Sequence, residues 1–402
     1  MRYRISKNGI SIGIRMLYFV FHFVSTIFIN RTLTTELKGE YAYIINMVSL
    51  LAIVGSLGLD LLYLEYKKRY GDSVLSSFLG LTLISSAFFV VVALISLCPY
   101  GNKEISYIFL LTAGHILYQN ISIFACVYNV QWRNITLLAV QIVYDFSLVL
   151  LFVFNVVDVG FFLIAYLLND LFVCLFFIIE CKMKVSWVFL RNAEDGWKKN
   201  ISVILSKGFR AMLISLLIAF NYNLDVIMLR KFNCDFSLIG IYSVGVTLSN
   251  IVLLVPDAFK EVLLGKVVRE NSVKTIRQYI KISIVFMLVM LLGFGVLGKF
   301  FIRSFYGEEY VEAYYITLIL FVGDIFMCLY KIIHPLFIAD GKRKNVLLFL
   351  LIAVVFNFVM NVFTIPKYSI YGAAVSSVGS YFVTGVLFYF YFINEYGQTS
   401  KI

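Results

Sequence analysis

Charged residues are scarce in this chain of 402 residues. Asp, Glu, Lys and Arg make up 14% of it, whereas hydrophobic residues make up 61% and aromatic residues 17%. A transmembrane helix needs roughly 20 mostly apolar residues. Stretches longer than that lack all four charged residue types, which excludes an ordinary soluble domain. These stretches are 73–102, 105–132, 345–366 and 368–394.

Other absences narrow the class of protein. The six cysteines have no CxxC spacing and no pairing with histidine, so neither a disulfide framework nor a zinc site is indicated. The first apolar run is too long for a signal peptide, contains Arg15 and lacks a small-residue cleavage site, so we expect it to stay as an anchor. The longest expected inner connections, 181–206 and 261–280, leave no room for a catalytic domain beside the bilayer.

The apolar runs predict an all-α polytopic membrane protein with about 12 transmembrane helices. An even number places both termini on one side. If that side is the cytoplasm, 24 of the 34 basic residues lie in inner segments, as the positive-inside rule requires. The net charge of +11 mostly reflects this bias, and no nucleic-acid partner is needed to explain it. The expected spans are 9–30, 41–64, 73–98, 105–130, 136–157, 159–180, 207–229, 238–260, 281–303, 313–339, 345–366 and 371–393.

The two halves of the chain echo each other. An offset of 201 residues pairs Gly39 with Gly240, and it also pairs Asp60 with Glu261. Because the order of matches is direct, we expect two six-helix bundles related by an axis along the membrane normal, with a cleft between them. The predicted domains are an N-terminal bundle (1–180), a cytoplasmic linker (181–206) and a C-terminal bundle (207–402).

Short motifs follow one another in a fixed order along nearly the whole chain. After a basic opening come LKGEY (37–41), SLGLD (56–60), NLD (223–225), IGIYS (239–243), YGEEY (306–310) with Ala313, ADGK (339–342), IP (365–366) and YGAA (371–374). Together they resemble the multidrug/oligosaccharidyl-lipid/polysaccharide (MOP) exporter superfamily, and within it the O-antigen and polysaccharide repeat-unit flippases.

This resemblance implies a MATE-like fold and transport by alternating access between two lobes. Its implied substrate is an undecaprenyl-diphosphate-linked oligosaccharide, carried from the inner to the outer leaflet of the bacterial inner membrane. Polymerase and other polysaccharide-assembly membrane proteins are candidate partners. No cofactor is expected, and a proton or sodium gradient is a candidate energy source. Such flippases vary with the sugar carried, so the resemblance supplies no binding motif at the level of residues.

Cations within or beside the apolar spans are candidates for binding a diphosphate head group. An ionisable side chain at mid-bilayer costs about 2.5–3.5 kcal/mol on insertion scales, so such residues usually face a cavity or a partner. Arg15 and Arg210, at similar positions on equivalent helices, would form a basic entrance on the cytoplasmic side, with Lys207 beside them. The competing interpretation is snorkelling to the interface. Lys331 lies deeper, where it would line the cavity or form a structural ion pair.

Acidic and histidine side chains inside the spans are candidates for ion coupling. Asp145, Asp170 and Asp324 fall near mid-depth, and His22 and His115 lie in the first and fourth spans. The alternative for each is a buried hydrogen bond to a neighbouring helix.

Gate and hinge candidates lie near the inner ends of the spans. Asp60, Asp257 and Glu261 would cap helices or form ion pairs at an inner gate. Pro256 and Pro335 each free a carbonyl group one turn earlier, which permits either a hinge or a static kink.

Two functions compete with the flippase. A cation-coupled multidrug or small-molecule exporter of the same superfamily fits the same pattern of helices. An O-antigen polymerase or ligase is also rich in spans and aromatic residues, but the absence of a large outer loop and the repeat of six plus six helices argue against it.

Overall fold

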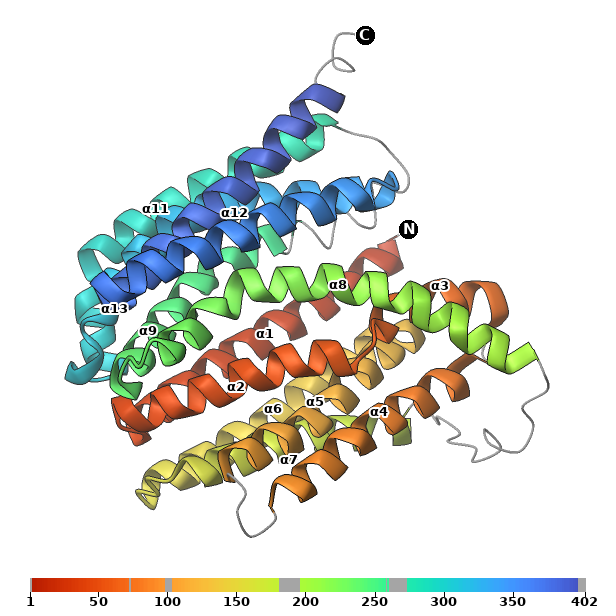
Figure 1. Ribbon diagram of the computed structural model, residues 1–402, viewed down its shortest axis with the longest axis horizontal. Coiled ribbons are helices and arrows are strands. Elements are labelled where there is room, and N and C mark those ends of the chain that lie inside the picture. Colours follow the sequence, from red (N-terminus) through yellow and green to blue (C-terminus); the bar gives the residue numbers. More distant parts are fainter. Residues whose placement is uncertain are drawn as a thin grey trace. The chain divides into compact units, whose positions relative to one another are not determined.

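The computed structural model describes residues 2–71, 74–97, 103–180, 196–257, 259 and 273–396. In this part of the chain all regular structure is helical (Figure 1). The helices are α1 (Arg2–Thr32), α2 (Thr35–Gly55), α3 (Leu59–Tyr70), α4 (Val74–Ser96), α5 (Lys103–Tyr128), α6 (Val130–Val153), α7 (Val159–Glu180), α8 (Gly196–Lys231), α9 (Phe236–Asn250), η3 (Ile251–Leu253), α11 (Val273–Phe305), η4 (Glu308–Tyr310), α12 (Ala313–Ala339) and α13 (Arg343–Tyr396).

The predicted fold class is confirmed by these helices. Eleven of the described helical segments are long and apolar enough to cross a membrane. The last of them, α13, has 54 residues and bends at Ser369, whose φ of 49° is not helical. It therefore contains both of the last two predicted spans, 345–366 and 371–393.

The chain divides into two compact units. The first consists of residues 1–34 and 44–216, and the second of residues 35–43 and 217–402. In the first unit α1 packs on α6, α4 on α5, and α7 on both α5 and α6. In the second unit α12 packs on α9, α11 and α13. The boundary between the units, at residues 216 and 217, lies inside α8, as does the predicted start of the C-terminal bundle at residue 207.

An aromatic cluster fills much of the core of the first unit. Tyr63, Phe78 and Phe124 come from α3, α4 and α5 and are fully buried. The ring centroids of Tyr63 and Phe124 are 4.3 Å apart. Such ring pairs stabilise by roughly 0.5–1.5 kcal/mol beyond the area that they bury. The cluster fixes α5, which carries several polar residues of the candidate site.

The predicted span 41–64 lies within a single segment that is long and apolar enough to cross a membrane, Thr35–Lys68, but the helix of this segment breaks between α2 and α3. Leu57 and Gly58 both have positive φ values, of 54° and 67°. A Cβ atom on Gly58 would lie 2.3 Å from the carbonyl oxygen of Gly208 on α8. Glycine is therefore required here both by its conformation and by the close approach of α8.

The two prolines that were expected to bend helices differ in their effect. Pro256 lies four residues after Val252, and the helix there narrows to the 3₁₀ segment η3. In a regular α-helix the ring of Pro256 would clash with the backbone carbonyl group of Val252. Pro335 lies inside α12, which continues as a helix to Ala339. A local irregularity is thus present before Pro256, and movement at either proline stays a prediction.

Glycines that are equivalent in the two halves meet each other in the second unit. A Cβ atom on Gly39 of α2 would lie 1.8 Å from the carbonyl oxygen of Phe236, and one on Gly240 of α9 would lie 2.1 Å from that of Thr35. The hydroxyl groups of Thr35 and Ser237 are 2.8 Å apart. Small residues that let two backbones touch are a usual device of membrane helices. The sequence repeat thus marks a direct helix–helix contact.

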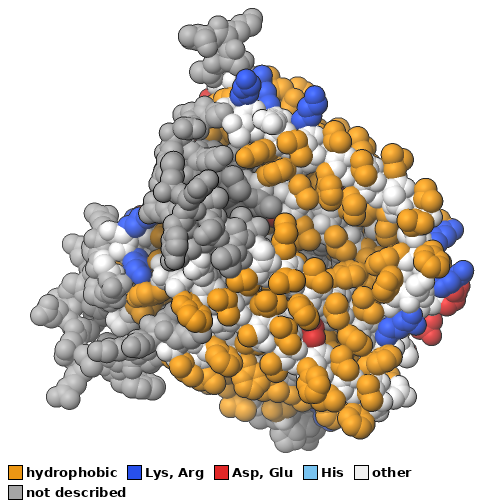
Figure 2. Space-filling view, turned by 180° about the vertical axis from the view of Figure 1, so that it is seen from behind, with side chains coloured by type: hydrophobic (Ala, Val, Ile, Leu, Met, Phe, Trp, Pro, Cys, Tyr) orange, Lys and Arg blue, Asp and Glu red, His pale blue; other side chains and the backbone are white. Residues whose placement is uncertain are grey.

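The described surface is largely apolar. Figure 2 shows hydrophobic side chains over most of one face, with lysine and arginine gathered at its margins. Large side chains such as Val296 and Leu292 of α11 are 82% and 72% exposed, which in water would be costly. Lipid rather than water is the solvent that suits this surface.

Candidate cation-lined pocket and buried carboxylates

A pocket of about 200 Å³ in the first unit brings together two arginines. Arg15 and Tyr18 come from α1, Tyr118 from α5, and Arg133, Asn134 and Leu137 from α6. Among the described residues, the six that line this pocket include no acid. Two guanidinium groups facing one small space attract an anion that can accept several hydrogen bonds, such as a phosphate or a carboxylate. We call this space the arginine pocket.

The start of α6 sets the position of Arg133. Asn129 caps this helix, and its side chain accepts hydrogen bonds from the backbone N–H groups of Gln131 and Trp132, at 3.0 and 3.3 Å. Arg133 therefore lies in the first turn of α6, where the helix dipole is positive. Its Nε donates to the hydroxyl of Ser122 at 3.3 Å, which holds the guanidinium beside α5. The guanidinium of Arg15 lies 5.6 Å from the ring centre of Phe19.

The other two basic candidates of this unit lie elsewhere on its surface. Lys207 and Arg210 are exposed on α8. The Nζ of Lys207 is 3.4 Å from Oε1 of Glu65 and 5.5 Å from the ring centre of Tyr66. Neither α8 residue lines the arginine pocket, so the grouping of Arg15 with Arg210 predicted from the sequence is replaced there by Arg15 with Arg133.

A histidine and a buried aspartate pair within the same unit. Nδ1 of His115 is 2.8 Å from Oδ2 of Asp170 and 3.0 Å from the hydroxyl of Tyr166. Asp170 is 2% exposed. The imidazole also packs against Tyr118, with ring centroids 5.5 Å apart. Because Tyr118 lines the arginine pocket, this pair lies one side chain away from it.

Asp145 belongs to a hydrogen-bonded contact between α1 and α6. Its Oδ1 accepts from the hydroxyl of Ser25 and from Nε2 of Gln141, the latter at 3.2 Å. Its Oδ2 is buried and has no hydrogen-bond partner among the described residues. His22, on α1, is exposed and stacks on Tyr18 with ring centroids 6.1 Å apart.

A buried polar cluster of the second unit surrounds Asp225 on α8. Oδ2 of Asp225 accepts a hydrogen bond from the hydroxyl of Tyr242 at 2.8 Å, and Oδ1 accepts one from Nδ2 of Asn361 at 2.7 Å. The hydroxyl of Ser377 also donates to Oδ2. Asn357 joins through its Oδ1, which is 2.7 Å from Nδ2 of Asn361. We call these five residues the Asp225 cluster; it holds a carboxylate in the buried interior of the unit.

Lys331 has a partner in its own unit. Its Nζ is 2.7 Å from Oδ2 of Asp257, and the two side chains are 14% and 43% exposed. This is the structural ion pair that competed with cavity lining for Lys331. Asp324 lies two turns earlier on α12 and is 1% exposed.

The gate candidates have ordinary contacts where they are described. Asp60 lies in the first turn of α3, and its Oδ2 accepts from Nε2 of Gln119 at 3.3 Å. Asp257 pairs with Lys331. Glu261 lies outside the described residues. Within the described part of the chain, no group of three or more His, Cys, Asp or Glu side chains could hold a metal ion.

The sequence pattern does not predict that Arg133 lines the arginine pocket or that Asp225 lies in a polar cluster. The expected spans 105–130 and 136–157 leave Arg133 in the connection between them, although two polar residues beside it, Asn129 and Asn134, mark a helix that begins at the pocket. Asp225 lies in the expected span 207–229, and the sequence pattern assigns no function to it. The signal for its cluster was the four-residue spacing of Asn357 and Asn361 in an otherwise apolar run, which places two amides on one helix face.

Comparison with known proteins places the fold. No protein-family model and no curated protein matches the chain. Solved structures do match it over nearly its whole length. The lipid II flippase MurJ, in an inward closed conformation, is 16% identical with a TM-score of 0.70, covering 96% of this chain and 87% of its own. An inward-facing multidrug resistance MATE family transporter of the MOP superfamily is 13% identical with a TM-score of 0.66, covering 98% of both chains.

A third solved structure is also similar over nearly the whole chain. The MATE transporter VcmN of Vibrio cholerae, in a mutant form, is 14% identical with a TM-score of 0.62 and 98% coverage of both chains. These identities are low, so the likeness concerns the arrangement of helices. The chain therefore has the MATE-like fold of the multidrug/oligosaccharidyl-lipid/polysaccharide exporter superfamily, as its sequence motifs predicted.

Proposed function

We propose that this protein is a transporter of the bacterial inner membrane that moves an anionic, lipid-linked oligosaccharide from the inner to the outer leaflet by alternating access. Undecaprenyl diphosphate is the proposed lipid carrier, and an O-antigen or other polysaccharide repeat unit the proposed cargo. The termini and residues 181–206 are proposed to lie in the cytoplasm, where the basic residues gather.

The arginine pocket is the observation that carries this proposal. A diphosphate is the fixed element of every such substrate, whatever its sugars, and it requires cationic donors in fork geometry. Arg15 and Arg133 supply two forks in one space among helices that are long and apolar enough to cross a membrane. Lys331 is left out of the head-group site, because Asp257 already neutralises it.

The buried carboxylates support coupling of transport to a cation or proton gradient. The Asp225 cluster offers a carboxylate, which can take up a proton, and together with its two amide side chains it offers oxygen ligands for Na⁺. The pair of Asp170 with His115 offers a second group that can exchange a proton. Buried acids that keep a partner in the membrane are usual in coupled transporters.

The same groups favour a second candidate, a cation-coupled exporter of drugs or small molecules. The charge of the side chains that line the arginine pocket distinguishes this candidate from the flippase. An exporter of cationic drugs requires acids rather than arginines around its substrate. The absence of an acid among the six described lining residues favours the anionic substrate.

A deletion strain tests the proposed function. The strain should accumulate lipid-linked repeat units whose sugars stay on the inner face of the membrane. Expression of the protein from a plasmid should remove this accumulation and bring the sugars to the outer face. Lipid extraction combined with a membrane-impermeant label for the glycan measures both quantities. If the purified protein instead lengthens glycan chains, it is a polymerase and the proposal is wrong.

A further inference from the structure

Residues of helix α6 line two cavities, which follow each other along the helix. Its first turns, through Leu137, face the arginine pocket. From Val140 to Leu151 it faces a second space of about 310 Å³, which lies between α6 and α7. Leu137, Val140, Tyr144 and Ser147 follow one another at steps of three or four residues, so they form one stripe along the helix. We call the second space the α6–α7 groove.

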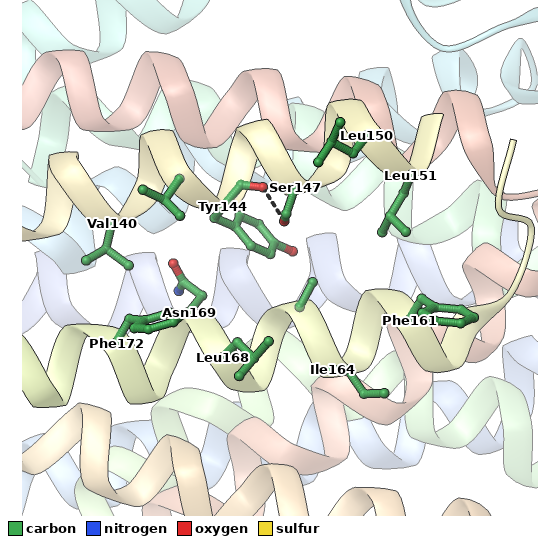
Figure 3. A pocket seen from close by; sticks show the side chains of 12 residues that line it. Val140, Tyr144, Ser147, Leu150, Leu151, Phe161, Ile164, Leu168, Asn169 and Phe172 are labelled. Carbon is green, nitrogen blue, oxygen red and sulfur yellow. Dashed lines mark hydrogen bonds between the residues drawn. The ribbon is translucent and has the colours of Figure 1, made fainter. Parts of the chain in front are cut away.

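The groove is suited to hydrocarbon. Its rims carry exposed apolar side chains, among them Val143 of α6 and Phe161, Ile164 and Leu168 of α7. Figure 3 shows Tyr144 and Asn169 pointing into it from the two facing helices. The hydroxyl of Ser147 is turned to its own helix, where it donates to the carbonyl oxygen of Tyr144 at 2.7 Å. The walls thus offer mainly apolar contact and only a few polar atoms.

The dimensions and charge of the two cavities fit one amphiphile. Residues 140–151 span about 16 Å along the helix, close to the half of the roughly 30 Å hydrocarbon core that one leaflet supplies. The arginine pocket lies just before the groove, toward the start of α6, with two cations and, among its described lining residues, no acid. An anionic head group followed at once by a long apolar chain matches this order of surfaces.

We propose that α6 seats a single polyprenyl diphosphate lipid, with its diphosphate between Arg15 and Arg133 and the first isoprene units of its tail in the α6–α7 groove. This proposal rests on the proposed function and adds to it the position of the carrier lipid within the first unit. In this arrangement the first unit recognises the carrier, which is common to all cargoes. The glycan extends from the diphosphate, away from the groove.

Binding of matched probes to the purified full-length protein in nanodiscs tests the arrangement. The probes are a polyprenyl diphosphate, the same polyprenol without phosphate, inorganic pyrophosphate and phosphatidylglycerol. Arg133→Gln removes part of the head-group site, and Ala165→Phe fills the groove, because Ala165 of α7 lines it. The controls are Arg277→Gln, an exposed arginine of α11, and Ala139→Phe, an exposed alanine of α6 that does not line the groove.

Each variant should weaken only the probes that contain the chemical group bound at the substituted part of the site. We expect Arg133→Gln to weaken polyprenyl diphosphate and pyrophosphate about tenfold, and to leave polyprenol unchanged. We expect Ala165→Phe to weaken polyprenyl diphosphate and polyprenol by a similar factor, and to leave pyrophosphate unchanged. Both controls should bind all probes as the wild type does.

Two results would overturn the proposal. Unchanged binding of polyprenyl diphosphate by Ala165→Phe, in protein that elutes as a single species, would place the tail elsewhere. Phosphatidylglycerol that competes as strongly as polyprenyl diphosphate would make this a site for bilayer lipid. Either result leaves the transport function intact if the deletion strain still accumulates lipid-linked glycan, so the two failures are distinguishable.

Discussion

Single residues of this protein show how a membrane-buried charge is stabilised. Lys331 and Asp257 neutralise each other over 2.7 Å, and the Asp225 carboxylate accepts three hydrogen bonds. Arg15 and Arg133 line one cavity, and its described lining residues include no acid. The sequence identified Arg15, Lys331 and the acids as costly to bury, but the partner of each comes from another helix and depends on packing.

The pair of Lys331 with Asp257 gives a prediction for stability. Lys331→Met leaves a half-buried carboxylate without its cation, which should cost roughly 2 kcal/mol, between the values for exposed and for buried pairs. Adding Asp257→Asn should recover much of this loss. Thermal unfolding in detergent, followed by size-exclusion chromatography, measures it. The control is Lys281→Met on an exposed position of α11. A double variant less stable than Lys331→Met would mean that the pair does not act as described.

At the scale of helices, the sequence located the apolar spans well, but it predicted the ends and the interruptions of the helices less well. Hydropathy located the apolar runs because lipid requires them wherever a helix crosses. It joined α2 to α3, because the break at Leu57 and Gly58 lies within an apolar run and depends on the approach of Gly208 from α8. It did separate the two halves of α13 near Ser369, since Pro366 and Lys367 interrupt the pattern there.

The contact between α2 and α9 gives a prediction at this scale. Gly240→Val adds a side chain where a Cβ atom would already lie 2.1 Å from a carbonyl oxygen, so it should push the helices apart. Overpacking of this kind typically costs 1–3 kcal/mol, and we expect about the upper end. The same substitution at Gly293 of α11, where a Cβ atom would meet nothing within 4 Å, should be tolerated. Equal melting temperatures for the two variants would contradict the contact.

At the scale of the whole molecule, composition alone identified a polytopic membrane protein, and the order of motifs identified its fold. The candidate site was predicted less completely. Arg15 could be identified because it interrupts an apolar run, whereas Arg133 falls between two expected spans, and only the folded structure shows that it lines the pocket. The identity of the cargo depends on glycan contacts that vary between such transporters, so the chain's common features do not encode it.

The central claim is that the arginine pocket binds the diphosphate of a lipid-linked oligosaccharide during transport. A transport assay in proteoliposomes tests this claim most directly. The quantity measured is the rate at which a fluorescent polyprenyl-diphosphate oligosaccharide becomes accessible to an added glycosidase. Arg15→Gln and Arg133→Gln should each slow this rate about tenfold, because a hydrogen-bonded charge is lost, and Arg15→Lys should retain part of it. Arg277→Gln should transport as the wild type does. Wild-type transport by the Arg15→Gln, Arg133→Gln double variant, or transport of a hydrophobic cation in place of the lipid, would contradict the account.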